Sequence, residues 1–80
     1  MTGKDTVESL LAQATENLEN AATATPRLDA ELLLCHQLDC FRTRFMTWPQ
    51  QTVRPEDAEA YRAMVARRCE GEPIAYITGE

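Results

Sequence analysis

Apolar residues in the first quarter of the chain recur with the period of one helix face. They occupy positions i, i+3, i+4, i+7 and i+11 and are Val7, Leu10, Leu11, Ala14 and Leu18. This spacing predicts an amphipathic helix over residues 5–20. Asp5 and Glu8 have the spacing of a capping box, with Asp in place of the usual Ser or Thr, so we expect them to begin the helix.

The second apolar segment is broader than one stripe. Thr25 and Pro26 are expected to open it, because Thr can cap a helix and Pro suits the first helical position, where its missing N–H would be unpaired anyway. The apolar residues that follow are Leu28, Leu32, Leu33, Leu34, Cys35 and Leu38. We therefore expect the second helix to be the most buried and to contact several neighbours.

Two more helices are predicted in the second half of the chain. Three aromatic residues at i, i+4 and i+7 indicate a short third helix that ends before Pro49; they are Phe41, Phe45 and Trp48. A fourth helix is expected from Pro55 to Gly71, with Val53 placed to pack on Ala58 at its start. Its apolar face consists of Ala58, Tyr61, Met64, Val65 and Cys69.

Four amphipathic segments joined by short loops predict an all-α fold. We expect a small antiparallel helical bundle of four to five helices over residues 4–71. The apolar run from Ile74 to Ile77 follows Pro73 and is the stretch with strand character. We expect residues 72–80 to form a short, loosely attached, strand-like connector without a partner strand.

Composition narrows the class of protein. Eighty residues allow one domain, and 44% hydrophobic residues suffice for a folded core. A net charge of −5 argues against direct binding to nucleic acid or to an anionic membrane. The three cysteines include no C-x-x-C pair, and no apolar run reaches the ~20 residues of a transmembrane helix. These features favour a reduced, soluble, cytoplasmic protein.

The candidate reactive side chains favour structural roles. Cys35, His36 and Cys40 lack a fourth ligand for a tetrahedral metal site, and His36 has no nucleophile with an orienting acid. Asp29 and Glu31 are two residues apart on a helix and do not share a face. We therefore predict no catalytic, cofactor-binding or metal-binding residue in these 80 positions.

Four side chains are expected to support the fold, namely those of Arg27, Glu31, Trp48 and Tyr61. Arg27 and Glu31 have the i, i+4 spacing of a helical ion pair. Trp48 and Tyr61 are expected to pack in the core, because each recurs with apolar neighbours at helical spacing.

Arginines are concentrated in the second half of the chain. Six of the eight cationic residues lie there: Arg42, Arg44, Arg54, Arg62, Arg67 and Arg68. This asymmetry is the best indication of a contact surface in an otherwise acidic chain. We choose Arg42, Arg44, Arg67 and Arg68 as candidate partner-binding residues. A solvated face that compensates helix dipoles would give the same pattern.

Three stretches carry a resemblance to a known family. TPRLDAELLLCHQL (25–38), the pair Arg42-Thr43 and RRCEGEPIAYITGE (67–80) resemble the N-terminal region of the PrmC/HemK family, the protein-(glutamine-N5) methyltransferases of peptide chain release factors. The resemblance covers nearly the whole chain. Asp39 departs from it, since related chains often have Gly there, and so does Arg54, where a Ser or Thr cap is common.

The resemblance implies a larger enzyme. Members of the family have an N-terminal helical bundle, a hairpin-like connector and a Rossmann-like domain that binds S-adenosylmethionine and methylates Gln in the release factor's Gly-Gly-Gln loop. It implies that the bundle docks the release factor and adjoins its own catalytic domain, that the chain continues past Glu80, and that these 80 residues alone are inactive. The alternatives are a freestanding helical adaptor and an independent Cys/His zinc enzyme.

Overall fold

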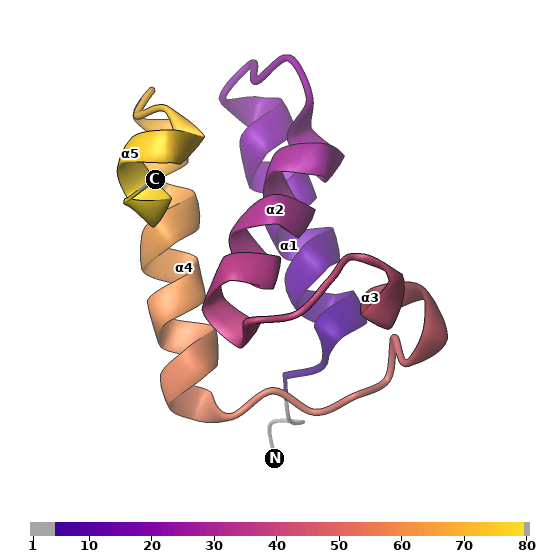
Figure 1. Ribbon diagram of the computed structural model, residues 1–80. Coiled ribbons are helices and arrows are strands. Elements are labelled where there is room, and N and C mark those ends of the chain that lie inside the picture. Colours follow the sequence, from indigo (N-terminus) through magenta and orange to yellow (C-terminus); the bar gives the residue numbers. More distant parts are fainter. Residues whose placement is uncertain (1–4, 80) are drawn as a thin grey trace.

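The computed structural model describes residues 5–79 (Figure 1). Within them it contains the helices α1 (Val7–Asn20), α2 (Pro26–Leu38), α3 (Thr43–Thr47), α4 (Pro55–Cys69) and α5 (Ile74–Thr78). The described residues form no sheet, and one isolated antiparallel bridge joins Thr6 to Thr52. The predicted all-α class is confirmed. Lys4 and Glu80, the outermost residues of the predicted bundle and connector, lie outside the described residues.

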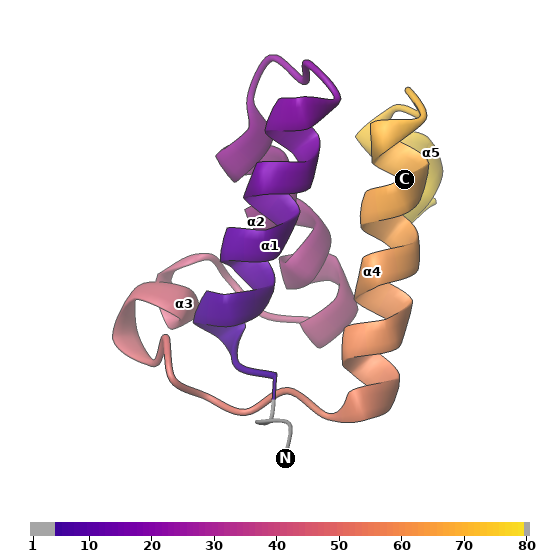
Figure 2. The ribbon, with the colours of Figure 1, turned by 180° about the vertical axis from the view of Figure 1, so that it is seen from behind.

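Three long helices form the body of the molecule. The chain runs along α1, returns along α2 and runs forward again along α4, so α2 is antiparallel to both neighbours (Figures 1 and 2). α2 contacts α1, α4 and α5, and α1 also contacts α4. The most completely buried large side chains are Val7, Leu10, Leu11, Leu18, Leu33, Leu34 and Tyr61. Their removal from water is the main favourable term in folding this small domain.

The start of α1 differs from the prediction. Thr6 is the N-cap: its Oγ1 accepts a hydrogen bond from the Ser9 backbone N–H (3.1 Å), and Ser9 Oγ accepts one from the Thr6 backbone N–H (3.0 Å). The prediction that Asp5 and Glu8 form the capping box is therefore wrong. A neutral hydroxyl pair, one residue further along the chain, satisfies the Thr6 and Ser9 N–H groups, and Asp5 pairs instead with Arg62 of α4 (2.7 Å).

The loop after α3 completes this cap. The Val7 N–H donates to the Gln51 carbonyl (3.0 Å), and the Glu8 N–H donates to the Pro49 carbonyl (2.9 Å). These N–H groups belong to the first turn of α1 and have no partner within the helix. The loop that carries α3 is therefore fixed to the N-terminal end of α1.

α2 begins at Pro26 and contacts several neighbours, as predicted, but it is not the most buried helix. Leu28 and Leu32 are exposed, whereas α1 buries all five of its predicted apolar residues. The reason is geometric: the apolar residues of α2 spread beyond the sector that α1, α4 and α5 cover. Asp39 caps the C-terminal end of the helix. Its φ of 54° is left-handed, a conformation that Gly adopts at lower cost and Asp tolerates.

α4 follows its prediction closely. It begins at Pro55, and Gly71 lies just beyond its end with a φ of 103°, where a side chain would be strained. Val53 and Ala58, expected to pack together at the helix start, both lie in the core. Tyr61 is 1% exposed, so the prediction that it is a core residue is confirmed.

The prediction of a strand-like, loosely attached run from Ile74 to Ile77 is wrong. These residues begin the helix α5, which packs against α2 and α4. Ile77 is buried and Ile74 is half-buried, because their i, i+3 spacing places both on one helix face. Tertiary packing has therefore overridden the local β-propensity of this run.

The helices of the described residues are all too short or too polar to cross a lipid bilayer.

Candidate functional site

α3 lies beside the start of α1 (Figure 1). The side chains of residues 41–48 are exposed except that of Phe45. Phe45 is the buried residue of α3, at 4% exposure, and anchors the short helix to the core. Thr47 Oγ1 donates to the Thr43 carbonyl (3.1 Å), and the Trp48 N–H donates to the Arg44 carbonyl (2.9 Å). These bonds close the single turn of helix on which the site is built.

Trp48 is exposed, so the prediction that it packs in the core is wrong. The i, i+4, i+7 spacing assumed a continuous helix from Phe41 to Trp48, but α3 comprises only Thr43–Thr47. Phe41 therefore precedes the helix and Trp48 follows it, and only Phe45 points to the core.

Arg44 stands on the exposed side of α3. Its guanidinium carbon lies 5.5 Å from the centre of the Trp48 ring, within the range of a cation–π contact. Its Nε donates to Gln51 Oε1 (3.1 Å). Within residues 5–79, Arg44 is the arginine that forms no ion pair with a carboxylate. Its positive charge is thus held in place but not neutralised.

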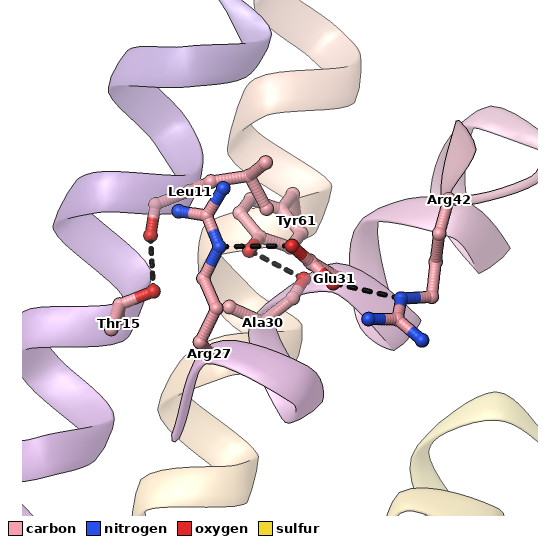
Figure 3. A network of polar contacts seen from close by, with 7 residues as sticks. All are labelled: Leu11, Thr15, Arg27, Ala30, Glu31, Arg42 and Tyr61. Atoms are coloured by element: carbon pink, nitrogen blue, oxygen red, sulfur yellow. Dashed lines mark hydrogen bonds and ion pairs between the residues drawn. The ribbon is translucent and has the colours of Figure 1, made fainter. Parts of the chain in front are cut away.

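Arg42 lies next to it and shares its carboxylate with another arginine. Arg42 Nε donates to Glu31 Oε1 (2.7 Å), and Arg27 Nε donates to Glu31 Oε2 (2.9 Å), which confirms the predicted Arg27–Glu31 pair (Figure 3). Two guanidinium groups on one carboxylate leave one positive charge in excess. Arg42 and Arg44 therefore give the α2–α3 edge a local charge opposite to that of the whole chain.

Arg67 and Arg68 lie in the last turn of α4. This end of α4 is at the opposite end of the molecule from α3 (Figures 1 and 2). Arg67 forms a bidentate contact with Glu72, with a shortest distance of 2.7 Å from Nη2 to Oε2. Hydrogen bonding within this pair lowers the pKa of Glu72 and raises the pKa of Arg67. The four candidate arginines thus form two separate pairs rather than one patch.

Arg68 takes part in a buried polar network. Its Nε donates to Asp29 Oδ2 (3.0 Å) and its Nη1 to the Glu72 carbonyl (3.0 Å), while Thr25 Oγ1 donates to Asp29 Oδ1 (3.0 Å). The Asp29 side chain is 7% exposed and that of Arg68 is 25% exposed. This network ties the start of α2 to the end of α4, a role for Asp29 that its position in the first helical turn did not reveal.

The cysteines and His36 do not assemble into a reactive centre. Burial raises the pKa of Cys35 to about 11, and a hydrogen bond with Cys40 adds to this shift. A thiol with a raised pKa is a poor nucleophile and a poor metal ligand. Within residues 5–79, no three His, Cys, Asp or Glu side chains are grouped to hold a metal ion.

Among residues 5–79, the two glycines do not form a Gly-rich turn of the kind that holds a nucleotide-type cofactor. Gly71 and Gly79 stand singly after α4 and α5, each with a positive φ angle, whereas such cofactors are held by a Gly-rich turn between a strand and a helix. Tyr61, the most buried phenol, is engaged by the fold: its hydroxyl donates to the Ala30 carbonyl (2.9 Å), and burial raises its pKa (Figure 3). No chemical step can be assigned to these side chains.

The described residues therefore define an all-α module whose α3 edge exposes aromatic side chains and an arginine. The model of the PrmC N-terminal domain family matches residues 9–79 of the chain. The chain belongs to this family.

Named relatives agree with that assignment. The chain is 43% identical over 79 residues to the release factor glutamine methyltransferase of Nitratidesulfovibrio vulgaris. The aligned region covers 99% of this chain and 27% of the relative. It is 41% identical over 73 residues to that of Aliivibrio fischeri, covering 91% and 26% respectively. The chain spans about a quarter of the length of these relatives. The comparison with solved structures gave no match.

Proposed function

We propose that this chain is the docking domain of a release factor glutamine methyltransferase. In this proposal the domain binds a peptide chain release factor, and a catalytic domain outside these 80 residues uses S-adenosylmethionine to methylate Gln in the Gly-Gly-Gln loop. Residues 72–80 lead toward that domain, and the protein works in the cytoplasm. The match of residues 9–79 to the family carries the proposal, since the relatives bear this enzyme's name.

Docking has a physical purpose in this reaction. A Gln side-chain amide is a poor nucleophile, so its nitrogen must be oriented and desolvated before it can attack the methyl group. Binding energy from a remote contact can hold the substrate protein in place for that step. A tethered module supplies an effective concentration of about millimolar, so a Kd between ~10 µM and ~1 mM for the domain alone would suffice.

Deletion tests the docking role. Full-length protein without residues 1–71 is expected to lose kcat/KM on intact release factor, mainly through a raised KM, because uniform binding is lost and the chemistry is not. A short peptide that contains only the Gly-Gly-Gln sequence should be methylated equally by both forms, which is the matched control. Unchanged kcat/KM on the intact release factor would contradict docking and would favour a role in stability or an adaptor with another partner.

The isolated 80-residue chain tests whether cofactor binding belongs to the catalytic domain alone. It is expected to bind no S-adenosylmethionine and to transfer no methyl group, because its described glycines form no Gly-rich turn and the buried Tyr61 and Asp29 are engaged in the fold. Isothermal calorimetry with the cofactor measures this directly. One-to-one binding at micromolar affinity would show that the cofactor site extends into this domain.

A further inference from the structure

We propose that the α3 surface, formed by Phe41, Arg44 and Trp48, receives a segment of the release factor that presents a carboxylate beside an apolar side chain. This inference rests on the proposed function and names the face of the domain that performs it. The observations that carry it are the exposure of the apolar groups, the free charge of Arg44 and the grooves beside Trp48.

The apolar side chains of this surface are unusually exposed. Phe41 is 85% and Trp48 is 57% exposed. Among the described residues, Met46 and Tyr76 are the other large apolar side chains that are more than half exposed. Phe41 and Trp48 line the same groove, and exposed apolar groups that lie together are typical of interaction sites. Phe, Trp and Arg are also residue types enriched where proteins meet.

Charge selects the chemistry of the partner. Arg44 carries a cation that no described carboxylate neutralises, and its contact with Trp48 holds it over an apolar face. Arg42 lies beside it, on a carboxylate already shared with Arg27. A carboxylate of the partner would therefore gain a planar, pre-positioned donor. Nucleic acid is disfavoured because the chain as a whole is acidic.

Two shallow grooves lie beside Trp48. One, of about 410 Å³, is lined by Asp39, Phe41, Arg44 and Trp48 among others. The other, of about 510 Å³, lies between Trp48 and the segment from Pro49 to Gln51. Asp39 forms no ion pair with Arg44, so a bound segment meets a cation and an anion in the first groove. This polarity would fix the direction in which the segment lies.

Other surfaces fit the role less well. The groove between α1 and α4, of about 490 Å³, is floored by core residues such as Leu10, Tyr61 and Val65. At its rim, Cys69 Sγ donates to the Asn17 carbonyl (3.6 Å) and Arg62 pairs with Asp5. Its arginine is thus paired within the domain, whereas Arg44 pairs with no described carboxylate.

The test uses the full-length methyltransferase and purified release factor. The double variant Phe41→Ser/Trp48→Ser is expected to raise KM about tenfold with kcat nearly unchanged, because a few aromatic anchors dominate binding energy. Arg44→Gln is expected to raise KM about threefold and to flatten its dependence on salt. Both sites are exposed, and circular dichroism establishes that each variant is folded.

Matched controls lie away from α3. Tyr76→Ser removes an equally exposed aromatic on α5, and Arg54→Gln removes an exposed arginine that has its own carboxylates, Glu56 and Asp57. Both are expected to leave KM within about twofold of the parent.

The outcomes separate this inference from the proposed function. If deletion of residues 1–71 raises KM while the α3 variants do not, docking stands and the α3 assignment is overturned. If the α3 variants weaken binding to a single-stranded RNA and not to the release factor, the surface serves nucleic acid and the assignment is also overturned. A raised KM in the α3 variants but not in the controls supports it.

Discussion

α3 and α5 are two five-residue helices that meet the body of the domain in different ways. Each buries one apolar side chain, Phe45 at 4% and Ile77 at 8% exposure. Each also has an exposed aromatic residue: Trp48 directly after α3 and Tyr76 within α5. Neither is long enough to be stable by itself, because helix nucleation is unfavourable and short helices are marginal in water. What differs is the kind of contact that holds each one.

Side chains hold α5. It packs against both α2 and α4, and the turn that leads into it is bound through Glu72, whose carboxylate pairs with Arg67 and whose carbonyl accepts a hydrogen bond from Arg68. Arg68 in turn pairs with Asp29. The arginines at this end are thus committed to the domain's own structure.

The buried side chain of Phe45 and backbone hydrogen bonds hold α3. It makes no extensive helix–helix contact within residues 5–79, and the loop after it is joined to the start of α1 by carbonyl groups of Pro49 and Gln51. Arg44 and the exposed aromatic residues Phe41 and Trp48 are therefore not needed for attachment. The arginines of the second half thus differ: those near α5 pair with carboxylates of the domain itself, whereas Arg44 near α3 pairs with no described carboxylate.

The largest expected effect concerns the anchor of α3. Phe45→Ala should lower the free energy of unfolding by about 3 kcal/mol, since it removes a buried ring and loosens the loop that caps α1. Urea unfolding followed by circular dichroism measures it. Phe41→Ala, an exposed neighbour, is the control and should cost less than about 0.5 kcal/mol. Equal costs would mean that α3 is not anchored through Phe45.

The buried ion pair comes next. Asp29→Asn should cost about 2 kcal/mol, because Arg68 keeps its charge in a site that is three-quarters buried and loses its counter-charge. Glu31→Gln removes a carboxylate two residues away whose arginine partners are more than half exposed, and should cost less than about 1 kcal/mol. Chemical denaturation compares the two. A larger loss for Glu31→Gln would reverse the roles assigned to these acids.

The anchor of α5 should matter somewhat less. Ile77→Ala is expected to cost about 1.5 kcal/mol, less than a central core truncation, because a terminal helix can detach while the three long helices stay packed. Amide hydrogen exchange should accelerate in α5 and stay unchanged in α1. Acceleration throughout the chain would show that α5 is part of the cooperative core.

The smallest effect is expected from pH. The pKa of Glu72 is lowered by its hydrogen bond from Arg67, so the contact contributes above the ordinary carboxyl pKa and is lost as pH falls through the lowered value. Hydrogen exchange in α5, corrected for the intrinsic rate, should therefore show less protection in acid than at neutral pH. Glu72→Gln should remove this dependence. An unchanged pH profile in that variant would assign the pH dependence to another titratable group.

The sequence predicted the long helices well and their details poorly. Periodic apolar residues located α1 and α4 because burial of one face depends on local spacing. The pair Arg68–Asp29 joins residues 39 positions apart, and such a contact cannot be derived from spacing along one helix. The misplaced cap of α1 has a local cause: Thr6 and Ser9 have the same three-residue spacing as Asp5 and Glu8, and spacing alone does not choose between the two pairs.

The short helices show the limit most clearly. Ile74 to Ile77 have β-propensity, and only their position between α2 and α4 makes them helical. Trp48 shares the spacing of a core residue, but the chain leaves the helical path before it. The candidate arginines could be chosen by composition, whereas the ion pairs that separate Arg44 from the others required the three-dimensional arrangement.

The hydrogen bonds between α1 and the loop after α3 also link binding to local opening. Val7 and Glu8 can exchange their amide protons only when the Pro49 and Gln51 carbonyls move away. A partner that binds the closed loop and not the open one slows this exchange by the factor 1 + [L]/Kd. Two amides at the start of the chain therefore report occupancy of a surface some forty residues later in the sequence, without a label on either protein.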